Sequence, residues 1–119
     1  MGARETVLTL PPGVRIYAHA RPTDLRRGFD RLAAMVRDIL REDAQSGHLF
    51  LFRNRSGDRM KILWHEPTGF WIFYKRLHRG TFSLPAARGD SEKVVKIEIE
   101  ASALAVILEG LELGARQRV

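Results

Sequence analysis

Residues 47–80 read GHLFLFRNRSGDRMKILWHEPTGFWIFYKRLHRG and contain three strand-like runs separated by two turns. The first run, 48–53, is apolar at successive positions, which is typical of a strand covered on both faces. The second, 59–65, alternates apolar and polar side chains, and the third, 70–77, is rich in the aromatic residues that favour strands. The intervening segments carry Asn, Gly, Asp and Pro, which favour turns. This stretch therefore predicts a β-meander.

Shorter strand patterns flank the meander. Residues 14–18 alternate as a short strand would, residues 81–84 form another short strand that Pro85 ends, and residues 94–100 alternate cleanly. Because most consecutive strands are joined by short turns, we expect a mostly antiparallel sheet of about five to six strands.

A long amphipathic helix is predicted over residues 24–41. Thr23 is placed to cap it, Asp24 falls in its positively polarised first turn, and Gly28 indicates either close packing on a strand or a slight irregularity. Its apolar stripe has members three and four residues apart: Leu25, Phe29, Leu32, Ala33, Val36, Ile39 and Leu40.

A short C-terminal helix is expected after Ser102, which can cap it, with Gly110 or Gly114 as its end. The predicted fold class is therefore α+β, in which the long helix packs on one face of the sheet. At 119 residues the chain has the size of one domain. The breaker cluster at 11–13 divides a flexible arm, 1–13, from a domain over 14–112, and residues 113–119 are expected to fray.

The composition points away from several classes of protein. With no cysteine, the chain cannot form disulfides, iron–sulfur clusters or thiolate zinc sites. No apolar run approaches the ~20 residues of a membrane helix, and the N-terminus is too short and mixed for a signal peptide. We therefore expect a cytoplasmic protein that does not bind a membrane.

Candidate catalytic residues find no supporting pattern. The histidines show no paired metal-ligand spacing, no glycine-rich phosphate loop is present, and Asp24, Asp58 and Asp90 fit a helix start, a turn and a linker. We expect no cofactor, no metal, no small-molecule substrate and no catalytic residue, so the chain is predicted not to be an enzyme.

Positive charge is concentrated in the meander of a chain whose net charge is +6. Arginine forks bind phosphate in bidentate fashion, so DNA is the predicted partner. The candidate binding residues are Arg53, Arg55, Arg59, Lys61, Lys75, Arg76 and Arg79, extended by Arg26, Arg27 and Arg31 on the predicted helix. Most of the interleaved aromatic residues are expected in the core.

Three segments resemble the TnpB accessory proteins of insertion-sequence family sixty-six: PTDLRRGFD (22–30), SGHLFLFRNRSGDRMKILW (46–64) and GFWIFYKRLHRGTFSLP (69–85). The resemblance extends over about residues 14–112. It implies a small protein encoded beside a larger transposase that carries the catalytic carboxylates, and it implies no catalytic residue in this chain.

Two functions remain open. The first is a non-catalytic, DNA-binding accessory factor of transposition. The second is a protein-interaction module that docks on the transposase through an exposed aromatic patch around Trp71 and Phe73, without contacting DNA. Association with further copies of the chain is also left open.

Overall fold

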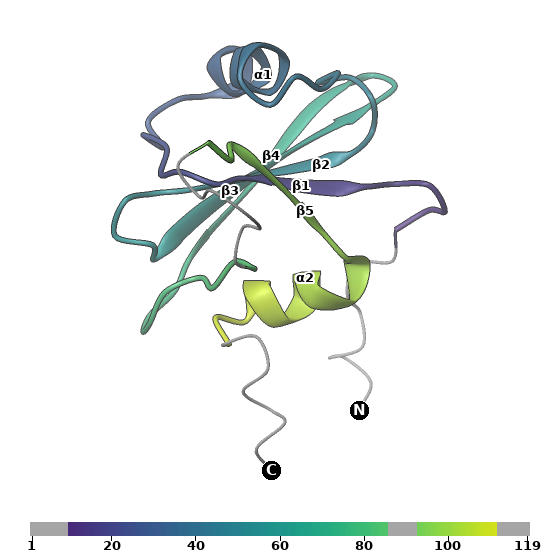
Figure 1. Cartoon of the computed structure of the whole chain (residues 1–119). Helices are drawn as coiled ribbons and strands as arrows, with labels where there is room; N and C mark the ends of the chain where they lie inside the picture. Colours follow the sequence, from purple (N-terminus) through teal and green to yellow (C-terminus); the bar gives the residue numbers. More distant parts are fainter. Residues whose placement is uncertain (1–9, 86–92, 112–119) are drawn as a thin grey trace.

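The predicted meander supplies three strands of a five-stranded sheet in the computed structural model, which describes residues 10–85 and 93–111 (Figure 1). Most of the predicted arm, the 86–92 segment and the predicted C-terminal tail lie outside the described residues. The elements in chain order are β1 (Ile16–His19), α1 (Phe29–Asp38), β2 (Leu49–Arg53), β3 (Arg59–Glu66), β4 (Gly69–Arg76), β5 (Lys96–Ile99) and α2 (Ala101–Leu108). The α+β class is confirmed.

The sheet is mixed, with strand order β4-β3-β2-β1-β5. β1 and β2 pair in parallel, with Tyr17 beside Phe50, whereas every other neighbouring pair is antiparallel. The sequence predicts a mostly antiparallel sheet, and the parallel pairing of β1 with β2 makes the observed sheet mixed. α1 connects β1 to β2, and a crossover of this kind is what parallel neighbours require.

Residues 81–84 do not form the strand that the sequence predicts. The Phe82 side chain is buried in the core instead, and its N–H donates to the Gly57 carbonyl at 2.8 Å. The segment therefore runs past the β2–β3 turn and contributes packing in place of a sheet ladder.

The helix predicted over 24–41 is shorter at both ends. The Asp24 carboxylate accepts hydrogen bonds from the Arg26 backbone and guanidinium, which closes a local turn, and α1 begins only after Gly28. At the other end Arg41 adopts a positive φ of 59°, which a helix cannot continue through. Gly28 is the N-cap, and a Cβ there would meet nothing within 4 Å, so the predicted close packing on a strand is wrong. Gly28 instead marks the point at which the predicted helix is interrupted.

Most of the predicted apolar stripe is buried, including Leu25 and Leu40 at its two ends. Leu32 and Val36 are fully buried, whereas Phe29 at the first position and Ile39 at the C-cap are exposed.

In α2, Ser102 lies within the helix and Glu100 is the N-cap, so the predicted cap is wrong. Gly110 follows the C-cap with φ 76°, which confirms it as the terminator.

The core has two layers because β2 is buried on both faces. Phe50 and Phe52 pack toward α1, while Leu49 and Leu51 pack toward α2. The two helices lie on opposite sides of the sheet (Figure 1). The alternation of side chains across a strand places successive residues in opposite layers. The prediction of a strand covered on both sides is confirmed.

No helix in the described part of the chain is long and apolar enough to cross a membrane.

One polar pair is buried beside this core. His19, at the end of β1, and Thr23 are almost inaccessible, and the His19 Nδ1 lies 3.1 Å from the Thr23 hydroxyl. The Thr23 hydroxyl therefore provides a hydrogen-bond partner for buried His19 instead of capping a helix. Burial, followed by the positive charges of Arg53, Arg21 and Arg27, lowers the pKa of His19 below its ordinary value of 6.5.

Replacing Phe50 tests the double-sided core. Phe50→Ala should lower the free energy of unfolding by about 3–5 kcal/mol, because a fully buried ring leaves a cavity. Phe29→Ala is the matched control, since its ring is half exposed and surface changes cost within about 0.5 kcal/mol. Urea unfolding followed by circular dichroism measures both. Equal losses would contradict the layered core.

Acidification should destabilise the protein through His19. Below pH 6.5 the unfolded chain binds a proton that folded His19 resists, so the free energy of unfolding should fall as pH decreases from about 7.5 to about 5.5. His19→Gln should flatten this dependence because it removes the titrating group. Urea titrations of both proteins at three pH values measure the effect. Parallel pH profiles would show that His19 is not its source.

Candidate nucleic-acid interface

The predicted basic residues lie toward one end of the sheet. Arg53 is the last residue of β2, Arg59 is the first of β3, and Arg59 pairs in register with Arg76, the last residue of β4. Arg55 lies in the turn between β2 and β3, and Arg79 follows β4. The antiparallel meander therefore gathers charges that are up to 26 positions apart in the sequence.

The β2–β3 turn is held in one conformation by its own side chains. Asp58 accepts hydrogen bonds from the Asn54 amide and the Ser56 hydroxyl, each at 2.9 Å, and these bonds lower the pKa of the Asp58 carboxyl. Asn54 in turn accepts from the Arg59 N–H at 3.0 Å, and Gly57 supplies a φ of 80°. This network engages the Asp58 carboxylate and leaves Arg55 exposed to solvent.

The segment after β4 is fastened beside this turn. The Leu77 N–H donates to the Asp58 carbonyl at 2.8 Å, and a Cβ on Gly57 would come within 3.2 Å of Thr81. Arg79, which is exposed, lies between these two attachments. Backbone hydrogen bonds therefore place the arginines of two loops at the same end of the sheet.

Arg53 connects β2 to the end of β1. Its guanidinium is half-buried and donates to the Ala20 carbonyl at 2.9 Å, and desolvation lowers the pKa of the group. Its carbonyl accepts from the Thr23 N–H at 2.7 Å. Arg53 and Arg55 also line an open cavity of about 450 Å³ together with Ser56.

Four other predicted residues have intramolecular partners. The Lys61 ammonium donates to the Arg27 carbonyl at 2.9 Å and stands 5.0 Å from the centre of the Tyr74 ring. Lys75 donates to the Leu108 carbonyl at 2.6 Å, where a cation stabilises the C-terminus of α2. Arg26 pairs with Asp24, and this pairing lowers the pKa of that carboxyl.

Arg27, the fourth, is partly buried and directs its guanidinium to the Met35 sulfur at 2.9 Å. Two hydrogen bonds join the loop that carries Arg26 and Arg27 to the meander. The Thr23 N–H donates to the Arg53 carbonyl, and the Lys61 ammonium donates to the Arg27 carbonyl. Arg31, on α1, is exposed. The predicted binding residues therefore differ in how much of their charge is available to solvent.

Four arginines keep their charge available to solvent. Within the described residues, the guanidinium groups of Arg55, Arg59, Arg76 and Arg79 are exposed and have no hydrogen bond or ion pair. Like charges this close repel one another, which an anion would relieve. At the opposite end of the sheet, by contrast, Arg15 is paired with Glu98 at 3.0 Å.

One further basic residue at this end, Arg21, was not among the predicted binding residues. Arg21 follows the end of β1, and the parallel pairing of β1 with β2 brings it to the same side of the molecule as Arg53. Its position could have been anticipated from the strand–helix–strand order, since the carboxyl ends of parallel neighbours share an edge.

The exposed arginines give this end donors of a kind that suits anions. Arginine guanidinium groups present fixed forks of N–H donors that match phosphate oxygens. Among the residues that the structure describes, no group of three or more His, Asp or Glu side chains is placed to hold a metal ion.

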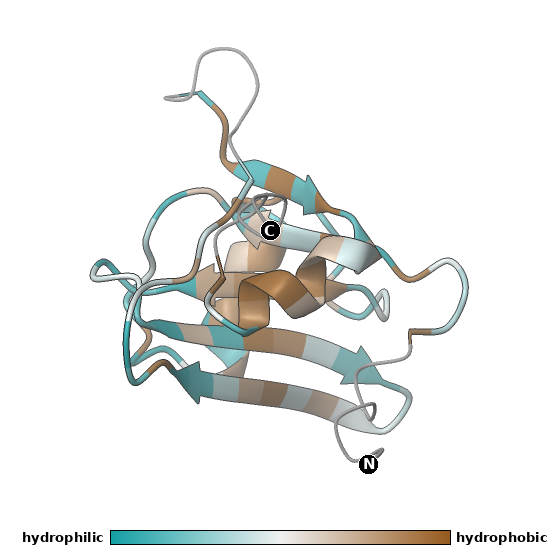
Figure 2. Cartoon of the chain, turned by 90° about the horizontal axis from the view of Figure 1, so that it is seen from below, coloured by the Kyte–Doolittle hydropathy of each residue, from teal (hydrophilic) through white to brown (hydrophobic). Residues whose placement is uncertain are grey.

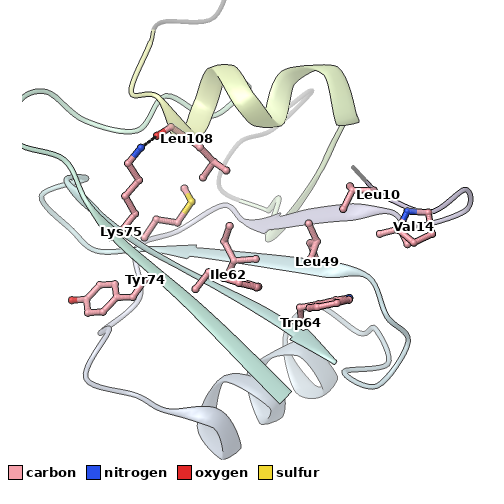
Figure 3. A pocket seen from close by; sticks show the side chains of 11 residues that line it. Leu10, Val14, Leu49, Ile62, Trp64, Tyr74, Lys75 and Leu108 are labelled. Carbon is pink, nitrogen blue, oxygen red and sulfur yellow. Dashed lines mark hydrogen bonds between the residues drawn. The ribbon is translucent and has the colours of Figure 1, made fainter. Parts of the chain in front are cut away.

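A second surface lies on the α2 side of β3 and β4. An apolar cavity of about 440 Å³ opens there between the sheet, the segment at Leu10 and the end of α2 at Leu108 (Figure 3). α2 is a short, hydrophobic helix that lies across this face, as Figure 2 shows from below. Trp71 and Phe73 are about half exposed, so the expectation that the aromatics are mostly core fails on β4.

Comparison with known proteins gives a consistent assignment. A family model described as IS66 Orf2 like protein matches residues 14–118. An uncharacterized protein of Sinorhizobium fredii, y4hO, is 38% identical over 105 residues, which cover 87% of each chain. A second uncharacterized protein of that organism, y4jC, is 33% identical over 76 residues, which cover 64% of this chain and 65% of the relative. No solved structure matches.

The extent of these matches confirms the resemblance carried by the meander and the segment before α1. This chain belongs to the IS66 Orf2-like family, a family of accessory proteins associated with insertion sequences.

Proposed function

We propose that this protein is a non-catalytic accessory factor of insertion-sequence transposition that binds DNA through the basic end of its sheet. The basic end is defined as Arg53, Arg55, Arg59, Arg76 and Arg79. Membership of the family supports a role in insertion-sequence transposition. Binding to DNA is the further part of the proposal.

One observation carries the proposal. Arg55, Arg59, Arg76 and Arg79 converge on one end of the sheet, are exposed, and make no ion pair or hydrogen bond with an acidic side chain among the described residues. The nearby carboxylates are already engaged, Asp24 by Arg26 and Asp58 by Asn54 and Ser56. The basic end therefore keeps a positive potential that attracts a polyanion.

The geometry favours contact with phosphates over reading of bases. The arginines project from two loops and two strand ends, and the helices lie on the faces of the sheet. Phosphate contacts position a protein on a duplex without carrying sequence information directly. The expected binding is therefore strongly salt-dependent and weakly selective for sequence.

The alternative, docking on the transposase without DNA contact, has one observation in its favour. Trp71 and Phe73 are exposed beside an apolar cavity, as a docking patch requires. It gives no role to the unpaired arginines at the other surface, so we place DNA binding first.

Loss of two arginines should weaken DNA binding and its salt dependence. For Arg55→Ala/Arg79→Ala, the slope of log K against log salt should become shallower by about 2, because each phosphate contact contributes about 1. Fluorescence anisotropy with a labelled duplex at several salt concentrations measures this.

The matched control is Arg15→Ala/Arg37→Ala. It removes the same charge, but Arg15 pairs with Glu98 and Arg37 with Asp38. Its slope should change much less than that of the test variant. Equal slopes for the two variants would mean that net charge alone drives binding, and absence of binding at low salt would sink the proposal.

A further inference from the structure

The two edges of the sheet are built differently. β5 has four residues, and two of them, Lys96 and Glu98, are charged. Short strands with charged side chains are a common way to prevent an edge from pairing with another chain. β4 has eight residues, and its charges stand only at its end, on Lys75 and Arg76. The β4 edge therefore lacks the protection that the β5 edge carries.

The β4 edge is open within the described part of the chain. β4 is the outermost strand and pairs only with β3, from Arg59↔Arg76 to Glu66↔Gly69. The backbone N–H and C=O groups on its outer side are thus available to a strand added from outside, which is how β-strand augmentation works. Such an edge, on a long strand whose charges stand only at one end, favours association.

The order of residue types at the centre of β4 is symmetric about Ile72. Phe70, Trp71, Ile72, Phe73 and Tyr74 run aromatic, aromatic, aliphatic, aromatic, aromatic. Read from either end, the order of residue types is the same. A two-fold interface presents the same patch from both subunits, so it needs this kind of self-complementarity.

We propose that the β4 edge is the interface between two copies of this chain, paired antiparallel about Ile72. On one face of the strand, Ile72 then lies opposite the partner's Ile72, and Phe70 lies opposite the partner's Tyr74. On the other face, Trp71 lies opposite the partner's Phe73. Directly opposed aromatic pairs stabilise antiparallel strands.

The orientation follows from the charges. In antiparallel register Lys75 meets the partner's Gly69, and Arg76 meets the partner's Thr68, so no cation faces another. A parallel arrangement in register would set each cation beside its own copy, and like charges directly opposite are destabilising. The distribution of charge therefore selects the antiparallel pairing.

Exposure of the rings supports an interface of useful size. Trp71 is 49% exposed, Phe73 43% and Tyr74 53%. A buried aromatic side chain covers roughly 150–250 Å², so the exposed halves of six rings offer on the order of 600 Å². Strand backbone and flanking side chains add to this, which brings the total toward the roughly 1,000 Å² of a specific interface.

The wild-type chain should behave as a dimer in size-exclusion chromatography with light scattering. Trp71→Lys/Phe73→Lys should be monomeric, because it places lysines opposite lysines. Trp71→Lys/Phe73→Glu should recover the dimer in low salt, because each lysine then faces the partner's glutamate. Circular dichroism checks that both variants fold, as exposed positions should allow.

A monomeric wild type at several hundred micromolar would overturn the proposal and leave the edge for another protein. A monomeric Lys/Glu variant that is folded would overturn the antiparallel register about Ile72.

A cross-link tests the register independently of these variants. The chain has no cysteine, so Ile72→Cys introduces a single thiol. Directly opposed residues in an antiparallel pair have Cα atoms about 4.5–5.5 Å apart, which lies within the range of a disulfide. Mild oxidation should therefore convert most of this variant to a covalent dimer.

Gln45→Cys is the control, since Gln45 is exposed in the segment between α1 and β2 and should cross-link far less. Equal cross-linking at the two positions would overturn the proposed centre. These readouts use no DNA, so their outcome is separate from that of the proposed function.

Discussion

The burial of β2 on both faces is the constraint on which the rest of the structure depends. Its successive side chains enter opposite layers, Phe50 and Phe52 toward α1, Leu49 and Leu51 toward α2. A strand of this kind must lie inside the sheet and needs cover above and below. β1 and β3 provide its neighbours, and the connection through α1 both covers one face and makes β1 parallel to β2.

That arrangement separates two surfaces by their chemistry. The antiparallel meander and the parallel β1–β2 pair carry the basic strand ends and loops to one end of the sheet. The aromatic residues of β4 instead lie along an edge, because β5 pairs with β1 on the far side of the sheet and leaves β4 outermost. In an antiparallel dimer about Ile72 the basic ends would point in opposite directions, so the two surfaces could be used together.

Local pattern predicted the strands of the meander closely, with bounds within one or two residues, and it predicted that both faces of β2 are apolar. On β3 it missed the burial of Leu63, which lies on the face expected to be polar. It failed where side chains bind partners distant in the sequence. Thr23 has the chemistry of a cap but hydrogen-bonds buried His19, and Asp24 closes a turn with Arg26 that delays the helix. Phe82 lies in a strand-like run, but its side chain is buried in the core. Burying the ring stabilises the fold more than the few hydrogen bonds of a short edge strand would.

The sequence by itself determined the meander, the excess of positive charge within it and the family to which the chain belongs. Only the tertiary structure decided which charges are available: Lys61 and Lys75 reach carbonyls 34 and 33 positions away, whereas Arg55 and Arg79 have no such partner among the described residues. It also decided that Trp71 and Phe73 stand exposed on an outer strand. The physical reason is that alternation along a strand fixes the face of a side chain, but neighbours distant in sequence fix whether that face is covered and that charge is paired.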